Sequence, residues 1–231
     1  MGHVSRCGPR ARALAQYPIM PNSGAMPSEN SSPLIVGLGG TANPNGTSER
    51  ALRHVLERCE ANGARTLLLG GASLDLPMYA PDIRDRTEKA AALIDGLRRA
   101  DGIVIASPGY HGTVSGLIKN ALDYVQDMAA DDRVYFEGRA VGLIAVASGW
   151  QATGTTLATL RAITHALRGW PTPMAVAVNS ATPLFADDGS IADTAIAQQL
   201  DVLALQVVSF ARMRALHELA DAAGDAEDGG D

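Results

Sequence analysis

The residues best suited to chemistry are Tyr110 and His111, which lie in the stretch SPGYHGTVSG at the end of an apolar run, 102–108. The same stretch holds four residues that shape or expose the backbone, namely Pro108, Gly109, Gly112 and Thr113. Glycine lets a backbone come close to a ligand, and proline stiffens a turn. A plain connection needs fewer turn signals than this. We therefore expect the loop to hold a flat ligand through its backbone amides. In the alternative interpretation, Tyr110 and His111 are ordinary exposed loop residues.

A second loop, GGTANPNGTSER at 39–50, follows another apolar run at 33–40. Its hydroxyl and amide side chains are Thr41, Asn43, Asn45, Thr47 and Ser48. A helix is expected to begin within it, so free backbone N–H groups and the positive end of the helix dipole would meet these side chains. This combination suits a phosphate, although the loop matches neither a Walker loop nor a complete GxGxxG pattern. The alternative is a helix start within a polar loop.

A third loop, ASGWQATGTTL at 147–157, follows the apolar run at 140–148. Ser148 and Gly149 precede Trp150, one of two tryptophans in the chain, and Gly154 follows. An indole can cover a flat ring or form the wall of a pocket. The alternative is a tryptophan that packs in the core or at an interface.

The elements that must position these loops are five apolar runs separated by segments with helical periodicity. The runs lie at 33–40, 65–71, 102–108, 140–148 and 174–178. Continuous apolar strands alternating with helices predict a parallel sheet covered on both faces. We expect an α/β, flavodoxin-like three-layer sandwich with a five-stranded parallel sheet in the order 2-1-3-4-5. In such a sheet ligands bind at the carboxyl ends of the strands, where the winding reverses, and the three loops belong to that edge.

Composition and charge argue against several classes of protein. The chain has 231 residues, 46% hydrophobic residues and a net charge of −6, with no basic stripe, which argues against nucleic-acid binding. Cys7 and Cys59 have the spacing of neither a metal site nor a disulfide framework, so we expect no metal and a cytoplasmic location. No apolar run approaches the length that spans a bilayer, so we expect no membrane association.

The two ends differ from the middle of the chain. Residues 1–32 carry arginines and many prolines and glycines, and residues 221–231 are acidic and small. We expect a disordered N-terminal extension at 1–32, one domain at 33–220 and a disordered acidic tail at 221–231.

A flat ring with a phosphate tail describes FMN, and the stretch SPGYHGTVSGLIKNALDYV also resembles a family signature. It is similar to the motif Pro-x-Tyr-x-Gly/Ala-x-x-x-Gly-x-x-Lys-Asn-x-Leu-Asp of the NAD(P)H-dependent FMN reductases. The matching residues are Pro108, Tyr110, Gly112, Ser115, Gly116, Lys119, Asn120, Leu122 and Asp123. The resemblance extends to the first loop and to the segment SLDLPMY, and so covers 33–215.

This resemblance implies an FMN-dependent oxidoreductase that passes a hydride from NADPH or NADH to flavin N5 and then to a small-molecule acceptor. Free flavin for a partner monooxygenase, a quinone and an azo compound all stay open as acceptors. Arg84 and Arg86 are candidates for the NADPH 2′-phosphate, although exposed arginines usually face water. Members are usually homodimers or homotetramers, and the long last helix and DLPMYAPDIRD are candidate interfaces.

The sequence departs from the family pattern in two loops. The arginine common in the first loop is missing, so phosphate binding would fall to Thr41, Asn43, Thr47, Ser48 and backbone amides. The loop after the fourth strand has Trp150 and Gln151 where glycines are common. In relatives linked to weak flavin retention, the helix that this signature enters carries an extra tyrosine; SGLIKNALDY shows no such insertion, which favours retained FMN. The flavin would carry the chemistry, and His111 alone among the five histidines lies in a candidate site.

Two other functions stay open at this point. An electron-carrier flavodoxin would suit the acidic charge, but carriers usually sandwich the ring between aromatic side chains, and only Tyr110 and Trp150 are available. Such a carrier would not be reduced directly by NADPH. A non-redox interaction protein could also use this fold, and it would bind no FMN.

Overall fold

The structure is a computed structural model that describes residues 32–228, with side chains as far as Asp221. The predicted N-terminal extension therefore lies almost entirely outside the described residues. The strands are β1 Leu34–Gly39, β2 Arg65–Leu69, β3 Gly102–Tyr110, β4 Thr113–Val114, β5 Ala140–Ala147 and β6 Trp170–Asn179. The helices are α1 Thr47–Ala61, α2 Glu88–Arg99, α3 Gly116–Asp123, α4 Trp150–Ala166 and α5 Thr194–Asp228, with short 3-10 turns η2 Gly71–Leu74 and η3 Tyr124–Met128.

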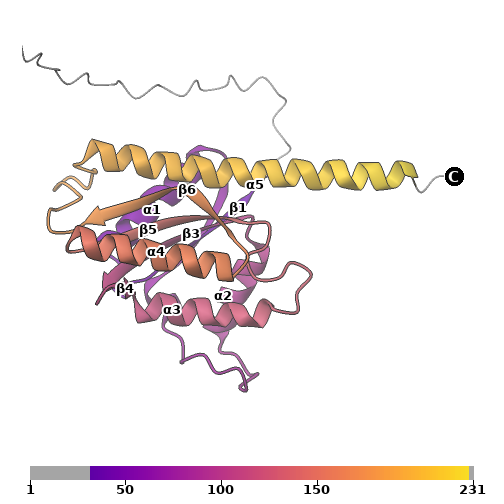
Figure 1. Cartoon of the computed structure of the whole chain (residues 1–231), viewed down its shortest axis with the longest axis horizontal. Helices are drawn as coiled ribbons and strands as arrows, with labels where there is room; N and C mark the ends of the chain where they lie inside the picture. The colour runs from indigo at the N-terminus through magenta and orange to yellow at the C-terminus, as the bar shows by residue number, and fades with distance from the viewer. Residues whose placement is uncertain (1–31, 229–231) are drawn as a thin grey trace, which may run out of the picture.

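Five parallel strands form the sheet in the order β2-β1-β3-β5-β6, which confirms the predicted order. Hydrophobic residues of α1 and α5 pack on one face, and those of α2, α3 and α4 pack on the other. Figure 1 shows α5 above the sheet and α3 and α4 below it. Central strands β1, β3 and β5 are buried along nearly their whole length, which explains their lack of polar alternation. The three-layer sandwich is therefore confirmed.

Three details differ from the expectation. A sixth strand, β4, pairs antiparallel with the end of β3. Helix α4 begins at Trp150, so most of the third loop, Gly154 included, is helical. The predicted boundary between domain and tail at residue 220 falls inside α5, which continues to Asp228.

Helix α5 is the one helix in the described part of the chain that is long and apolar enough, over Thr194–Asp221, to cross a membrane. Length and composition alone are weak evidence, because core helices of soluble proteins meet the same condition. One face of α5 packs on the sheet beside α1, through Leu203, Ala204, Val207 and Val208.

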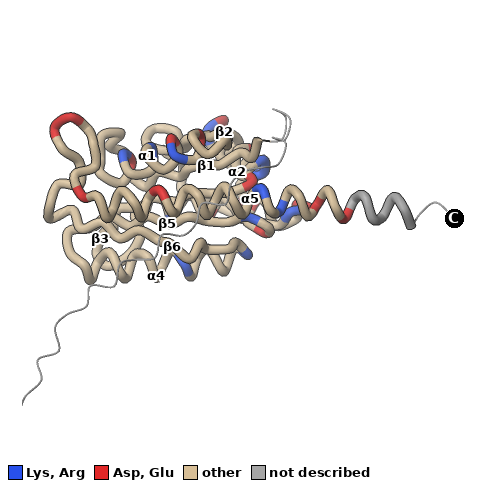
Figure 2. The backbone as a smooth tube through the Cα atoms, turned by 90° about the horizontal axis from the view of Figure 1, so that it is seen from above, with Lys and Arg blue, Asp and Glu red and all other residues tan. Residues whose placement is uncertain are grey.

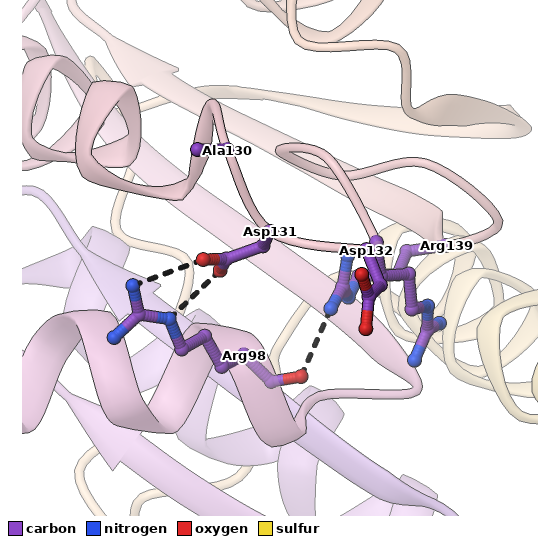
Figure 3. A pocket seen from close by; sticks show the side chains of 6 residues that line it. Arg98, Ala130, Asp131, Asp132 and Arg139 are labelled. Carbon is purple, nitrogen blue, oxygen red and sulfur yellow. Dashed lines mark hydrogen bonds and ion pairs between the residues drawn. The ribbon is translucent and has the colours of Figure 1, made fainter.

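The amino-terminal edge of the sheet is held by Arg139, whose side chain is fully buried. Its guanidinium donates to the backbone carbonyls of Ala100, Tyr135 and Arg98 at 2.7–2.9 Å. Figure 3 shows the pocket of about 400 Å³ beside it, where Arg98 pairs with Asp131. Burial lowers the pKa of Arg139 to about 10. This pocket lies at the opposite edge of the sheet from the predicted site, and the guanidinium groups of Arg98 and Arg139 beside it already have partners.

Candidate functional site

The stretch after the central strand is a β-hairpin. Strand β3 continues through Tyr110, and Gly109 and Tyr110 pair with Val114 and Thr113 of β4. The two residues at the tip, His111 and Gly112, have φ angles of 52° and 85°. A two-residue hairpin turn with both φ angles positive is favoured because its twist matches that of the strands. The stretch predicted as a loop is therefore a hairpin that extends the central strand β3.

The tip of this hairpin is open to an approaching group. A Cβ atom placed on Gly112 would meet nothing within 4 Å, and Tyr110, His111 and Thr113 are exposed. Gly109 has a different role, because a Cβ there would lie 2.5 Å from Oγ1 of Thr156 on α4. The space on the Cβ side of Gly109 is therefore taken by α4, and a contact between its backbone and a ligand stays a prediction. Its small size lets α4 pack against the hairpin.

The loop between β1 and α1 is ordered by its own side chains. The backbone N–H of Asn43 donates to Thr41 Oγ1 at 3.2 Å, and that of Asn45 donates to Asn43 Oδ1 at 3.0 Å. Helix α1 begins at Thr47 after Gly46, which has no side chain to cap it, while Ser48 is buried in the first turn. Thr41 and Asn43 thus shape the loop, and the first-turn N–H groups of α1 receive no side-chain cap.

A buried carboxyl lies behind this loop. Glu49 is almost fully buried, its Oε1 accepts from Arg53 at 3.1 Å, and its Oε2 has no partner among the described residues. The carboxyl lies against Gly39 and Gly70, where a Cβ would collide with it. Burial disfavours the negative charge of the Glu49 carboxylate and so raises its pKa. Residues 40–46, of which 42–45 are exposed, contain no acidic side chain, so an anion there would meet little repulsion.

The first two loops are joined through Ser115. Its Oγ donates to the Gly40 carbonyl at 2.7 Å and accepts from Ile118 N at 3.2 Å, so Ser115 caps the start of α3. The backbone N–H of Ser115 in turn donates to Ser107 Oγ at 3.0 Å. Ser107, buried in an apolar strand, was missed by sequence reasoning, although a lone hydroxyl at the end of such a strand is a usable signal. These bonds hold the two loops in one unit.

The third loop is a tight turn. Gly149 has a φ of 126°, and its N–H donates to Asn179 Oδ1 at 3.0 Å. Trp150 follows as the first residue of α4 and is 65% exposed, so it is not a core residue, and Ser148 is exposed beside it. Sequence reasoning also missed Asn179 as a partner of the third loop. An amide side chain directly after the apolar run at 174–178 is the signal that could have indicated it.

The segment 76–79 is clamped by a residue of the family signature. Asn120 is buried, accepts from Tyr79 N at 2.8 Å and donates to the Pro77 carbonyl at 2.9 Å. Tyr124 donates to the same carbonyl at 3.0 Å. Asn120 therefore positions a neighbouring segment, which its place in the motif did not reveal.

Arg86 is not free to meet a phosphate. It makes two hydrogen bonds to Asp127, at 2.7 and 2.8 Å, and lies over the rings of Tyr79 and Tyr124. Hydrogen bonds from Arg86 hold the pKa of Asp127 below its usual range. Of the two arginines considered for NADPH, only Arg84 is exposed.

Comparison with known proteins decides the family. The model of the family described as NADPH-dependent FMN reductase matches residues 33–183.

The chain belongs to the NADPH-dependent FMN reductase family.

Relatives agree with this assignment. The chain is 30% identical over 139 residues to the FMN-dependent NADPH-azoreductase of Staphylococcus aureus (strain USA300), covering 59% of this chain and 70% of that protein. The solved structure of RosB with 8-demethyl-8-formylriboflavin-5′-phosphate bound has a TM-score of 0.67 at 16% identity, covering 87% of this chain and 88% of RosB. FerB, an NAD(P)H:(acceptor) oxidoreductase from Paracoccus denitrificans, has a TM-score of 0.62 at 22% identity, covering 79% and 98%. The two structures support the fold.

This FMN reductase family member is therefore an enzyme that uses FMN, takes electrons from NAD(P)H and reduces a second acceptor. Its residues fit FMN by chemistry: an uncapped helix N-terminus suits the phosphate, and the open backbone of Gly112 suits a flat ring. In the part of the chain that the structure describes, no group of three His, Cys, Asp or Glu residues could hold a metal ion.

Proposed function

We propose that the carboxyl edge between β1 and β3 holds FMN, with its phosphate at the N-terminus of α1. Thr41, Asn43, Thr47 and Ser48 would surround the phosphate together with backbone amides. The ring would lie on the hairpin at 108–113, with Ser148, Gly149 and Trp150 at its rim. When bound, FMN supplies a hydride acceptor at N5 and the redox chemistry. The observation that carries this proposal is the bare hairpin tip, joined to the α1 loop through Ser115.

The chain's own residues would bind the flavin and orient its ring. Backbone amides of the hairpin would fix the ring edge, since Gly112 leaves them uncovered. Exposed Trp150 would cover one side and exclude water from it. His111, exposed at the tip with a positive φ, would stand where a donor can steady negative charge near the ring.

For the second substrate we propose a small aromatic acceptor, an azo compound or a quinone. Tyr110 and Trp150 are 56% and 65% exposed beside the hairpin, and flat apolar molecules stack on such rings. One relative is named as an azoreductase. Free flavin for a partner monooxygenase is the second candidate, because its ring is also flat and would stack on the same side chains. We further propose a cytoplasmic homo-oligomer, in line with the single buried cysteine described and the exposed apolar side chains of α5.

The first experiment is a visible spectrum of the purified protein with FMN, followed by anaerobic addition of NADPH and then NADH. We expect bound flavin that NADPH bleaches and that an azo dye or a quinone reoxidises. Bound flavin that stays oxidised would instead identify an electron carrier. Absence of binding would contradict the assignment of these loops.

A further inference from the structure

Glu49 is the only acidic residue that is buried in the part of the chain described with side chains, and its side chain is 2% exposed. It is the third residue of α1. An acidic side chain at this position commonly reaches back to the free N–H groups at the helix start. Here it turns inward instead, with Oε2 against Gly39 and Gly70 and without a partner among the described residues. The carboxyl is therefore held beneath the loop that opens α1 and does not cap the helix.

The charge of this carboxyl is balanced by a single cation. Acidic and basic residues lie close together along α1, as Figure 2 shows, and Arg53 donates to Glu49 Oε1 at 3.1 Å. Arg50, the next residue along the helix, stacks on Phe185 instead, 3.7 Å from the ring centroid. The other elements packed against the carboxyl are β1, the loop 40–46 and η2, and their sequences contain no charged residue. The Arg53 side chain is 49% exposed, so water screens the one attraction that Glu49 has.

The carboxyl lies close to the place proposed for the flavin phosphate. The first hydrogen bond of α1 runs from Arg50 N to the Gly46 carbonyl at 3.0 Å, which leaves the N–H groups of Thr47, Ser48 and Glu49 without a partner inside the helix. The carboxyl carbon of a glutamate is at most about 5 Å from its own backbone nitrogen. A phosphate oxygen bound at about 3 Å from these N–H groups is then within about 8 Å of the Glu49 carboxyl.

Two negative charges at this separation oppose each other. Salt screens buried charges little, and about 8 Å is one Debye length even in physiological salt. At an effective dielectric constant of about 20, unit charges about 8 Å apart repel by the equivalent of a roughly tenfold to thirtyfold change in a binding constant. Burial already raises the pKa of Glu49 above its ordinary value of 4.5, so its neutral form is accessible. A proton on the carboxyl would remove the repulsion.

We infer that Glu49 takes up a proton from solvent when the flavin phosphate binds, and that this carboxyl makes the affinity for FMN depend on pH. The inference rests on the proposed function, because it needs the phosphate at the start of α1. The coupling is reciprocal, so a ligand that prefers the neutral carboxyl also strengthens its hold on the proton. Affinity for FMN is highest where Glu49 is already neutral in the free protein. It falls as pH rises through the range in which the free carboxyl ionises, and it levels off once the carboxyl ionises in the complex as well.

Isothermal titration calorimetry of the full-length protein with FMN, in pairs of buffers with different ionisation enthalpies, counts the protons taken up. From about pH 6 to 8.5 we expect the dissociation constant of the wild type to rise about tenfold more than that of Glu49→Gln, with a larger proton uptake. The phosphate itself titrates near pH about 6, and the comparison between proteins cancels that contribution. Glu49→Met is the second variant, because the amide of Gln would lack a partner at the place of Oε2. The matched control is Glu57→Gln, an exposed glutamate of the same helix, which should behave as the wild type.

Equal proton uptake and equal pH dependence in the wild type and both Glu49 variants would overturn the inference. An equally strong dependence with riboflavin, which lacks the phosphate, would overturn it too. Ala42→Asp adds a charge to the exposed loop 40–46 without changing Glu49, and it should weaken the binding of FMN and not of riboflavin. If Ala42→Asp acts in this way and the Glu49 variants do not differ from the wild type, the phosphate site stands and the inference fails. If Ala42→Asp has no effect, or FMN does not bind, the proposed function fails and the inference with it.

Discussion

At the scale of single residues, Gly112 provides both a left-handed backbone for the hairpin turn and open space for a ligand. Its φ of 85° disfavours side chains, and the space around it is open. We expect Gly112→Val to raise the dissociation constant of FMN at least about hundredfold, roughly 2.7 kcal/mol, because its branched side chain would occupy the place of the ring in the proposed site. Fluorescence titration with FMN measures the loss.

The chain offers a matched control for that change. Gly189 also has a positive φ, 87°, in the loop after β6, and only Arg50 lies within 4 Å of a Cβ placed there. Gly189→Val should cost a similar amount of stability through backbone strain and leave the affinity for FMN unchanged. If both variants bind FMN equally well, the hairpin does not hold the ring.

Asn120 is the second residue whose effect can be isolated. Asn120→Ala removes partners from Tyr79 N–H and the Pro77 carbonyl, and we expect a loss of about 2 kcal/mol in the free energy of unfolding. Asn120→Asp keeps the oxygen that accepts from the backbone N–H of Tyr79 and loses the N–H group that donates to Pro77. The backbone amide of Tyr79 should therefore be better protected from hydrogen exchange in this variant than in the alanine variant. Equal protection in the two variants would contradict the clamp.

At the scale of elements, the connection from η2 to α2 is fastened to η3 by Arg86 and Asp127. The carboxyl of Asp127 has a pKa below its ordinary value of 3.8, chiefly through hydrogen bonds from Arg86. A lowered pKa means stability that is present above the ordinary value and lost as pH falls through the folded-state pKa.

We therefore expect Asp127→Asn to lower the free energy of unfolding by about 1–3 kcal/mol at neutral pH. The variant should also lose less stability than the wild type below the ordinary pKa, since the titrating carboxyl is gone. Urea unfolding as a function of pH provides both values. The control is Asp95→Asn, which removes an exposed pair with Arg99 and should cost about 0.5 kcal/mol or less.

Sequence patterns predicted the central elements well, because each central strand is buried on both faces and its apolar run is unbroken. They failed at the hairpin, where a two-residue turn of His111 and Gly112 lacks the usual Asn-Gly signal. They also failed at Trp150, since glycines on both sides concealed a helix start. Pairings of distant residues, such as Ser115 with Gly40, depend on tertiary packing that no local pattern encodes.

At the scale of the whole molecule, the proposed cofactor site and the buried Arg139 lie at opposite edges of the sheet. Arg139 ties three backbone carbonyls at the amino edge, far from the hairpin in the topology. We expect Arg139→Leu to lose about 3–5 kcal/mol of stability, because those buried carbonyls lose a charged partner. The folded fraction should bind FMN with wild-type affinity, and a changed dissociation constant would contradict this separation.

The Ser107–Ser115–Gly40 connection has a kinetic consequence. It fastens both ends of the proposed cofactor site to the central strand, so the site cannot open by parting the phosphate end from the ring end without disrupting the core. In the proposed site, the cofactor would then leave past the exposed rim, at Trp150. The residues at the rim would therefore set the residence time of the cofactor. Substitutions at the rim alone would change a retained cofactor into an exchangeable one within a family, while the fold stays unchanged.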